Sequence, residues 1–290
     1  MKTAFSLFCA LAATLAAAVA YGMTSWQATT RNIRARMNTA RLSAGPAVYS
    51  ERELDGLPEP VQRYFRAVLR DGQRMIAVAR FAGQGQFRRS EAAESWAPFR
   101  ATQMVTVQPP AFDWDARIAW LPGVRMLVRD AYVARSGILH ATAFGLVTVA
   151  QQRGTPELAQ GELMRFLAEA PWYPTALLPS QGVHWEAIDS STARASLTDG
   201  PTTVSLDFHF DAEGLITDIR SQGRYRLLNG VPILTPWQGR FSSYDERFGI
   251  RIPLEGEVAW VTPSGPIPYW RGCIAQISYE LEEGRRARLD

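Results

Sequence analysis

The chain has 290 residues and a formal net charge of +3, with 47% hydrophobic and 20% charged residues. This composition is that of an ordinary globular protein and excludes a disordered chain, a collagen-like repeat and a coiled coil. Only one stretch is apolar enough to cross a bilayer, which excludes a polytopic membrane protein. The basic residues are almost all Arg and form no concentrated positive surface, so we expect no nucleic-acid partner.

Residues 1–23 predict a signal peptide or an N-terminal membrane anchor. Lys2 precedes an apolar or small stretch from Ala4 to Ala20, and Ala18-Val19-Ala20 has the form of a signal-peptidase site. The same stretch is about long enough to span a bilayer, so both cleavage and retention stay open. In either case we expect a bacterial cell-envelope protein, either periplasmic or anchored to the inner membrane by this segment.

Residues 24–50 indicate a linker or juxtamembrane segment, followed by a single β-rich domain over residues 51–290. The segment is mostly polar and ends at Gly45-Pro46, although Trp26, Ile33 and Met37 would share one face of a helix. It also carries a cluster of arginines. Positive charge after an apolar segment usually stays in the cytoplasm, which opposes export, but the order of charge, apolar core and cleavage site favours it.

The folded body begins with a helix and then changes to a period of two. A helix is predicted from Pro58 or Pro60 to Gly72, and a second from the cap Thr155 to about Ala170. An apolar connection bounded by prolines, residues 171–179, follows the second helix. Strands are predicted at 74–81, 84–90, 99–107, 112–120, 124–134, 137–150, 183–188, 193–198, 202–210, 215–227, 236–244, 250–260 and 269–281.

The turn signal Asp199-Gly200 sets a register for the middle strands. Pairing around it places Ala195 opposite Val204 and Leu197 opposite Thr202, which collects the apolar side chains on one face. So many antiparallel strands must curl strongly or close in part. We therefore predict a mainly β (α+β) fold, in which two or three helices pack against a large, strongly curved antiparallel sheet or half-open barrel.

The sequence lacks the common catalytic, cofactor and metal-binding strings, so we expect no cofactor and no metal. The candidates for acid–base chemistry are Glu162, Glu169 and His184. Glu162, Arg165 and Glu169 follow i, i+3, i+7 spacing on the second predicted helix, and this spacing is equally typical of ordinary ion pairs on a helix surface. His184 shares a strand face with Glu186, which favours a solvated sheet face over a site.

Aromatic residues are the more unusual feature, with nine Trp in the chain. They predict either plain core packing or an aromatic-lined cavity in the curled sheet, suited to an acyl chain or another amphiphile. The candidate ligand-binding residues are Trp172, Leu177, Trp185, Phe208 and Trp237.

The connection Trp172–Pro179 carries a specific expectation. Connections are normally polar and exposed, so an apolar one must be buried or cover an opening. We expect Trp172 and Leu177 to be mostly buried and the main cavity to lie within reach, whether these residues plug the sheet or form the rim of the cavity.

Several strings together resemble a bacterial family of uncharacterised proteins, a domain of unknown function, over roughly residues 57–282. They are Leu57-Pro-Glu-Pro-Val-Gln-Arg-Tyr64, Trp96-x-Pro-Phe-x-Ala-x-Gln103, Gly161-Glu-Leu-x-Arg-x-Leu-x-Glu169, Trp172-x-Pro-Thr-Ala-Leu-Leu-Pro179, Ile250-Arg-Ile-Pro253 and Tyr269-Trp-Arg-Gly272. The resemblance supplies no activity and no catalytic residue. At the level of the fold, the plan is similar to the periplasmic lipoprotein carriers, whose half-open barrel holds acyl chains.

Three classes of function follow. The leading hypothesis is a non-enzymatic envelope protein that binds a hydrophobic or lipid-like ligand in the curled sheet, with membrane contact through the N-terminal segment if it is retained. The alternatives are an enzyme of unrecognised class that uses Glu162, Glu169 or His184, and a structural or protein-interaction module of the envelope.

Overall fold

The computed structural model describes residues 2–42, 45–90, 94–228 and 230–282. These ranges contain three α-helices: α1 (Lys2–Thr39), α2 (Glu59–Val68) and α3 (Pro156–Glu169). Four short 3₁₀ helices are η1 (Glu51–Leu54), η2 (Ala170–Trp172), η3 (Pro174–Leu177) and η4 (Pro179–Gln181). The strands are β1 (Ile76–Ser90), β2 (Ser95–Thr106), β3 (Ala111–Leu121), β4 (Val124–Val133), β5 (Ser136–Ala143), β6 (Val147–Arg153), β7 (Val183–Ala187), β8 (Thr192–Asp199), β9 (Thr202–Phe210), β10 (Ile216–Leu228), β11 (Val231–Arg247), β12 (Ile250–Thr262) and β13 (Gly265–Leu281).

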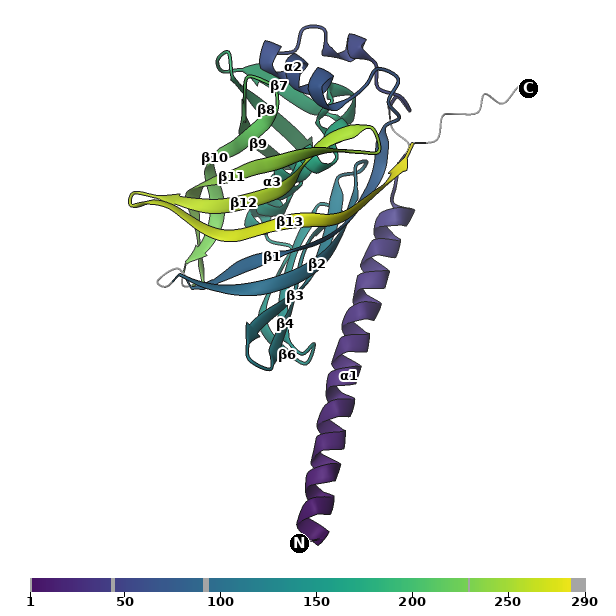
Figure 1. The fold of residues 1–290 in the computed structure, drawn as a ribbon, viewed down its shortest axis with the longest axis vertical. Coiled ribbons are helices and arrows are strands. Elements are labelled where there is room, and N and C mark those ends of the chain that lie inside the picture. The colour runs from purple at the N-terminus through teal and green to yellow at the C-terminus, as the bar shows by residue number, and fades with distance from the viewer. Residues whose placement is uncertain (1, 43–44, 91–93, 229, 283–290) are drawn as a thin grey trace, which may run out of the picture.

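These thirteen strands form one sheet in which every neighbouring pair is antiparallel. The order is β6-β5-β4-β3-β2-β1-β13-β12-β11-β10-β9-β8-β7, so the first and last strands of the chain pair in the middle. The two edges, β6 and β7, are consecutive in the sequence and do not pair. The sheet curls into an open half-barrel with three helices against it (Figure 1), which confirms the predicted fold class.

Helix α3 lies inside the curve of the sheet, between its two halves. It contacts β4 and β5 in one half and β9 and β10 in the other. Its start follows from the sequence: Pro156 occupies the first turn, and the Thr155 hydroxyl accepts a hydrogen bond of 3.2 Å from the Leu158 amide. The helix and the connection after it thus bridge the gap between the edge strands β6 and β7.

The connection from residue 171 to 179 forms the end of η2, all of η3 and the start of η4, and it is buried from residue 171 to 178. Trp172 is 6% exposed and Leu177 is fully buried, as expected from their apolar character. Trp172 packs edge-on against Phe81 and Phe241, with ring centroids 5.8 and 6.0 Å apart. An apolar connection is stable here because it continues the core instead of crossing the surface.

Three details of the strand prediction are wrong. The predicted strands 74–81 and 84–90 are one continuous strand, β1, which begins only at Ile76, and 137–150 lies in a hairpin of β5 and β6. The register around Asp199 is shifted by two residues, because Asp199 itself still pairs with Thr202 and the turn lies one step later. Ala195 accordingly faces Leu206. A shift of two keeps every side chain on its face, so the predicted apolar face survives.

Helix α1 differs most from the expected linker, because it continues unbroken to Thr39. Figure 1 shows its C-terminal part beside the outer face of β2 and β3, with the N-terminal part extending past the sheet. The docked part is held by partly buried polar contacts. Arg34 pairs with Asp113 at 2.7 Å, and Trp26 donates to Asp115 at 2.9 Å. Trp26 and Met37 are buried, which explains the apolar face noted in the sequence.

Candidate functional site

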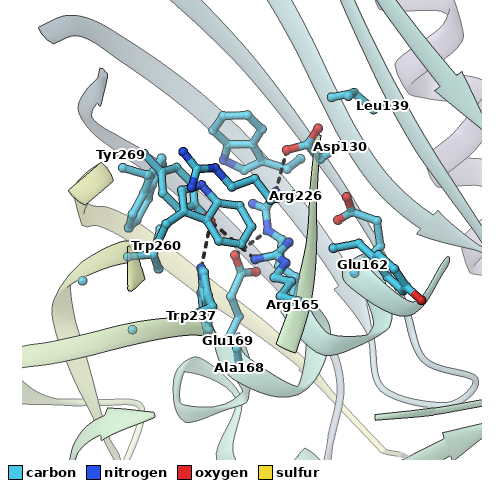
Figure 2. Close-up of a pocket in the computed structure, with 18 of the residues that line it drawn as sticks. Asp130, Leu139, Glu162, Arg165, Ala168, Glu169, Arg226, Trp237, Trp260 and Tyr269 are labelled. Carbon is cyan, nitrogen blue, oxygen red and sulfur yellow. Dashed lines mark hydrogen bonds and ion pairs between the residues drawn. The ribbon is translucent and has the colours of Figure 1, made fainter. Parts of the chain in front are cut away.

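A cavity of about 430 Å³ lies between α3 and the inner face of the sheet (Figure 2). Its size falls in the range of small-molecule sites in proteins. Helix α3 supplies one wall, and strands from both halves of the sheet supply the other. The lining includes Leu227, which is 46% exposed. Nine residues of the described lining are aromatic: Phe87, Trp114, Trp172, Tyr225, Trp237, Phe241, Trp260, Tyr269 and Trp270.

Part of the aromatic wall is held in place by its own hydrogen bonds and ring contacts. The Trp237 indole donates to the Tyr269 hydroxyl at 2.9 Å, as drawn in Figure 2. The rings of Trp260 and Tyr269 stack with centroids 5.3 Å apart. Arg224 lies over the Trp237 ring at 5.2 Å. Because these side chains fix one another, they form a rigid apolar wall on β10–β13.

The opposite wall contains ionised side chains on α3. Arg165 donates to Glu169 at 2.7 Å and to Asp130 on β4 at 2.9 Å, and its guanidinium stacks over Trp114 at 5.0 Å. The Arg165 and Glu169 side chains are each only 15% exposed. Gln103 donates to the second Glu169 oxygen at 2.6 Å. A desolvated charge network of this kind is stable only while its members stay paired.

Glu162 lies on α3 one turn before Arg165, and it is 6% exposed. Among the residues that the structure describes, its Oε2 atom has no hydrogen-bond partner, and neither has Oδ1 of Asp130. Burial, followed by the negative charge of Asp130, raises the pKa of Glu162 to about 8. The site therefore contains a carboxyl group that is protonated at neutral pH and is open to a ligand.

The structure brings together some of the predicted site residues and separates others. Trp172 and Trp237 line the cavity. Leu177, Trp185 and Phe208 are absent from the described lining and form core instead: the Trp185 indole donates to the Leu177 carbonyl at 2.9 Å, and its ring packs edge-on against Phe208. Their apolar character reflects the core of the β7–β9 corner.

The alternative catalytic set is divided in the same way. Glu162 and Glu169 share the cavity, whereas the His184 side chain is 74% exposed on the edge strand β7, beside Glu186. The prediction of ordinary ion pairs on an exposed surface of α3 is wrong, because strands from both halves of the sheet cover this helix. Glu169 and Arg165 do pair, but inside the sheet.

Sequence reasoning missed two residues that complete the site, Asp130 and Arg224. Asp130 lies on β4, and its carboxylate meets Arg165 inside the fold. Gly161 was a usable signal: an interior glycine weakens a helix, so its presence in α3 indicates a close approach or an open space. A Cβ atom placed there would meet only Arg224, at 3.9 Å.

The expected burial of the Trp172–Pro179 connection beside a cavity is confirmed, since Trp172 and Leu177 are buried and Trp172 lines this cavity. Within the described ranges, no group of three His, Cys, Asp or Glu side chains converges to hold a metal ion.

The fold and the cavity define an open antiparallel half-barrel with an internal helix and an aromatic-lined chamber. The chain belongs to a family of unknown function, DUF6920, whose family model matches residues 55–279. A search of curated proteins gives no match.

A search of solved structures finds matches to this chain, two of which follow. A LolA superfamily protein from Nitrosomonas europaea is 10% identical with a TM-score of 0.40, covering 77% of this chain and 93% of its own. A β-barrel-like protein of the DUF1849 domain from Brucella abortus is 8% identical with a TM-score of 0.27, covering 71% of this chain and 99% of its own.

Proposed function

We propose that this protein binds a hydrophobic, lipid-like ligand in the cavity between α3 and the sheet. The observation that carries the proposal is the cavity of about 430 Å³ with its wall of aromatic side chains. Transfer of an apolar chain from water to such a wall stabilises the complex by about 25 cal/mol per Å² of apolar surface buried. The interlocked rings of Trp237, Trp260 and Tyr269 support a preformed site over one that collapses when empty.

Gly161 offers a direct test, because it is the point where α3 leaves the cavity open. Gly161→Leu should fill the space beside Arg224 and abolish binding of the apolar fluorophore N-phenyl-1-naphthylamine. Gly161→Ala is the matched control: it removes the same helix-weakening glycine, stabilises the protein by up to about 1 kcal/mol and keeps the cavity open. Equal fluorophore affinity in both variants, with both folded, would reject the cavity as the site.

The envelope location is part of the same proposal. Helix α1 is long and apolar enough to cross a membrane, and its C-terminal part is docked on the sheet through Arg34 and Trp26. A retained α1 would therefore hold the cavity at a fixed distance from the bilayer that supplies the ligand. Removal of residues 2–20 should release a folded protein from the membrane fraction. Expression of the full chain that yields a shortened, soluble protein would instead favour cleavage.

Acid–base catalysis by Glu162 is a second candidate function, favoured by its raised pKa inside a cavity. An activity screen against lipid esters and amides tests it. Glu162→Gln should abolish any activity found, and survival of the activity in this variant would exclude the role. His184→Ala is the control, because His184 is exposed and lies outside the cavity lining.

A further inference from the structure

The polar end of the cavity has an uncompensated carboxyl group. Asp130 and Glu169 both pair with Arg165, and Arg224 supplies the second positive charge from β10. The lining also holds Arg226 and Arg240 and, on the acidic side, Glu157 and Glu257, so its carboxyl groups outnumber its guanidinium groups by five to four. Two carboxyl groups of the described lining each have one buried oxygen without a hydrogen-bond partner, Glu162 Oε2 and Asp130 Oδ1.

We propose that the Glu162 carboxyl group recognises a cationic amine, so that the ligand is an amphiphile with a positively charged head and an apolar body. The inference rests on the proposed function, because it assigns the head of the ligand that the cavity would hold. Glu162 Oε2 and Asp130 Oδ1 are both buried acceptors without a partner among described residues. An ammonium group carries three donors and no acceptor, so it could satisfy both oxygens.

The aromatic wall suits the same head. The faces of Trp and Tyr rings attract cations, and the wall already holds the guanidinium of Arg224 over Trp237 at 5.2 Å. A carboxylate head has only acceptor oxygens and could donate a hydrogen bond to neither Glu162 Oε2 nor Asp130 Oδ1. Charge and hydrogen-bonding capacity therefore favour the same class of ligand.

Proton exchange accompanies the binding. The charged groups that face Glu162 are Asp130 from β4, Arg165 and Glu169 from its own helix, and Arg224 from β10. Glu162 has a pKa of about 8, and an arriving ammonium ion needs the ionised carboxylate. The head therefore displaces one proton. Affinity for an amine should increase with pH up to about 8 and fall about tenfold for each pH unit below it.

The test uses the full chain in lipid nanodiscs, with empty nanodiscs subtracted, and titrates octylamine, 1-octanol and octanoate by calorimetry at pH 6 and pH 8. Octylamine should bind about 50-fold more tightly at pH 8 than at pH 6, because it stays protonated at both values. Glu162→Gln should lose this pH dependence and at least about tenfold of the amine affinity at pH 8. Glu162→Asp should restore part of both.

The matched control is Glu246→Gln, which removes the same charge outside the cavity lining, where Glu246 is mostly exposed and pairs with Arg70. This variant should titrate like the wild type. Two results would overturn the amine head while leaving the apolar cavity as the binding site. One is tighter binding of octanoate than of octylamine. The other is equal affinity for octanol and octylamine in both the wild type and Glu162→Gln. Failure of all three ligands and of N-phenyl-1-naphthylamine to bind would instead reject the proposed function.

Discussion

Glu162 makes the stability of the protein depend on pH in the direction opposite to that of a salt-bridged carboxylate. Its pKa is about 8 in the folded chain and lies near the ordinary value of 4.5 once the chain unfolds. The folded state therefore binds more protons between these values. Its free energy of unfolding should fall as the pH rises through this window, by at most about 1.4 kcal/mol per pH unit.

Urea unfolding of the wild type and Glu162→Gln at pH 5 and pH 8.5 measures this effect. We expect the two proteins to have similar free energies of unfolding at pH 5, and the variant to be the more stable at pH 8.5. Glu157→Gln corrects for the loss of a charge on the same helix. A wild type that loses no stability relative to Glu162→Gln over this range would show that Glu162 titrates normally.

The same residue shows where inference from sequence stops at this scale. The spacing of Glu162, Arg165 and Glu169 indicates only that they share a helix face. Whether that face meets water depends on Asp130 and Arg224, which lie tens of residues away in the sequence and arrive through the sheet topology. Trp172 was predictable because an apolar residue in a connection has few other environments open to it.

At the scale of elements, α1 shows how a helix can be fastened to a sheet by charge. Asp113 and Arg129 are almost fully buried and pair at 2.9 Å, and Arg34 of α1 joins the same carboxylate at 2.7 Å. Arg129 also stacks over the Trp26 ring at 4.4 Å. The face formed by Trp26 and Met37 was visible in the sequence, but the polar attachment was not, since its partners belong to β3 and β4.

Asp113→Ala should destabilise the protein by about 3–5 kcal/mol, because it leaves the Arg129 guanidinium buried without its main partner. Thermal or urea unfolding measures the change. Glu246→Ala is the control, since it breaks the pair with Arg70 on the surface, where both side chains are mostly exposed, and should cost at most about 1 kcal/mol. Equal effects of the two substitutions would contradict a buried attachment of α1.

The alternation of apolar and polar residues predicted which strands exist and which face of the sheet each side chain occupies. It did not predict where the strands end. Residues 137–150 alternate through the turn that separates β5 from β6, so the pattern alone could not divide them. The Asp199-Gly200 signal placed the turn, but not whether Asp199 still pairs across it. Both errors concern backbone hydrogen bonds, on which side-chain periodicity gives no information.

At the scale of the whole molecule, the pairing of β1 with β13 joins the two halves of the sheet. The ladder runs from Ile76 opposite Leu281 to Phe87 opposite Trp270. A chain that ends at residue 264 should lose this strand and, with it, the cooperative unfolding transition. A chain that ends at residue 282 keeps all of β13 and should unfold like the full protein by circular dichroism. A folded, cooperative chain without β13 would show that each half of the sheet is stable alone.

The same central pair has a consequence for synthesis. Strand β1 leaves the ribosome early, but its partner β13 is completed about 190 residues later, by the count from Ser90 to Leu281. At 5–20 residues per second, the first half-sheet waits roughly 10–40 s with the main chain of β1 unpaired on one side. An unpaired strand is a template for association with other chains. The nascent protein is thus most vulnerable to aggregation during translation of its second half, which makes β1 the natural binding site for a chaperone that acts before the chain is complete.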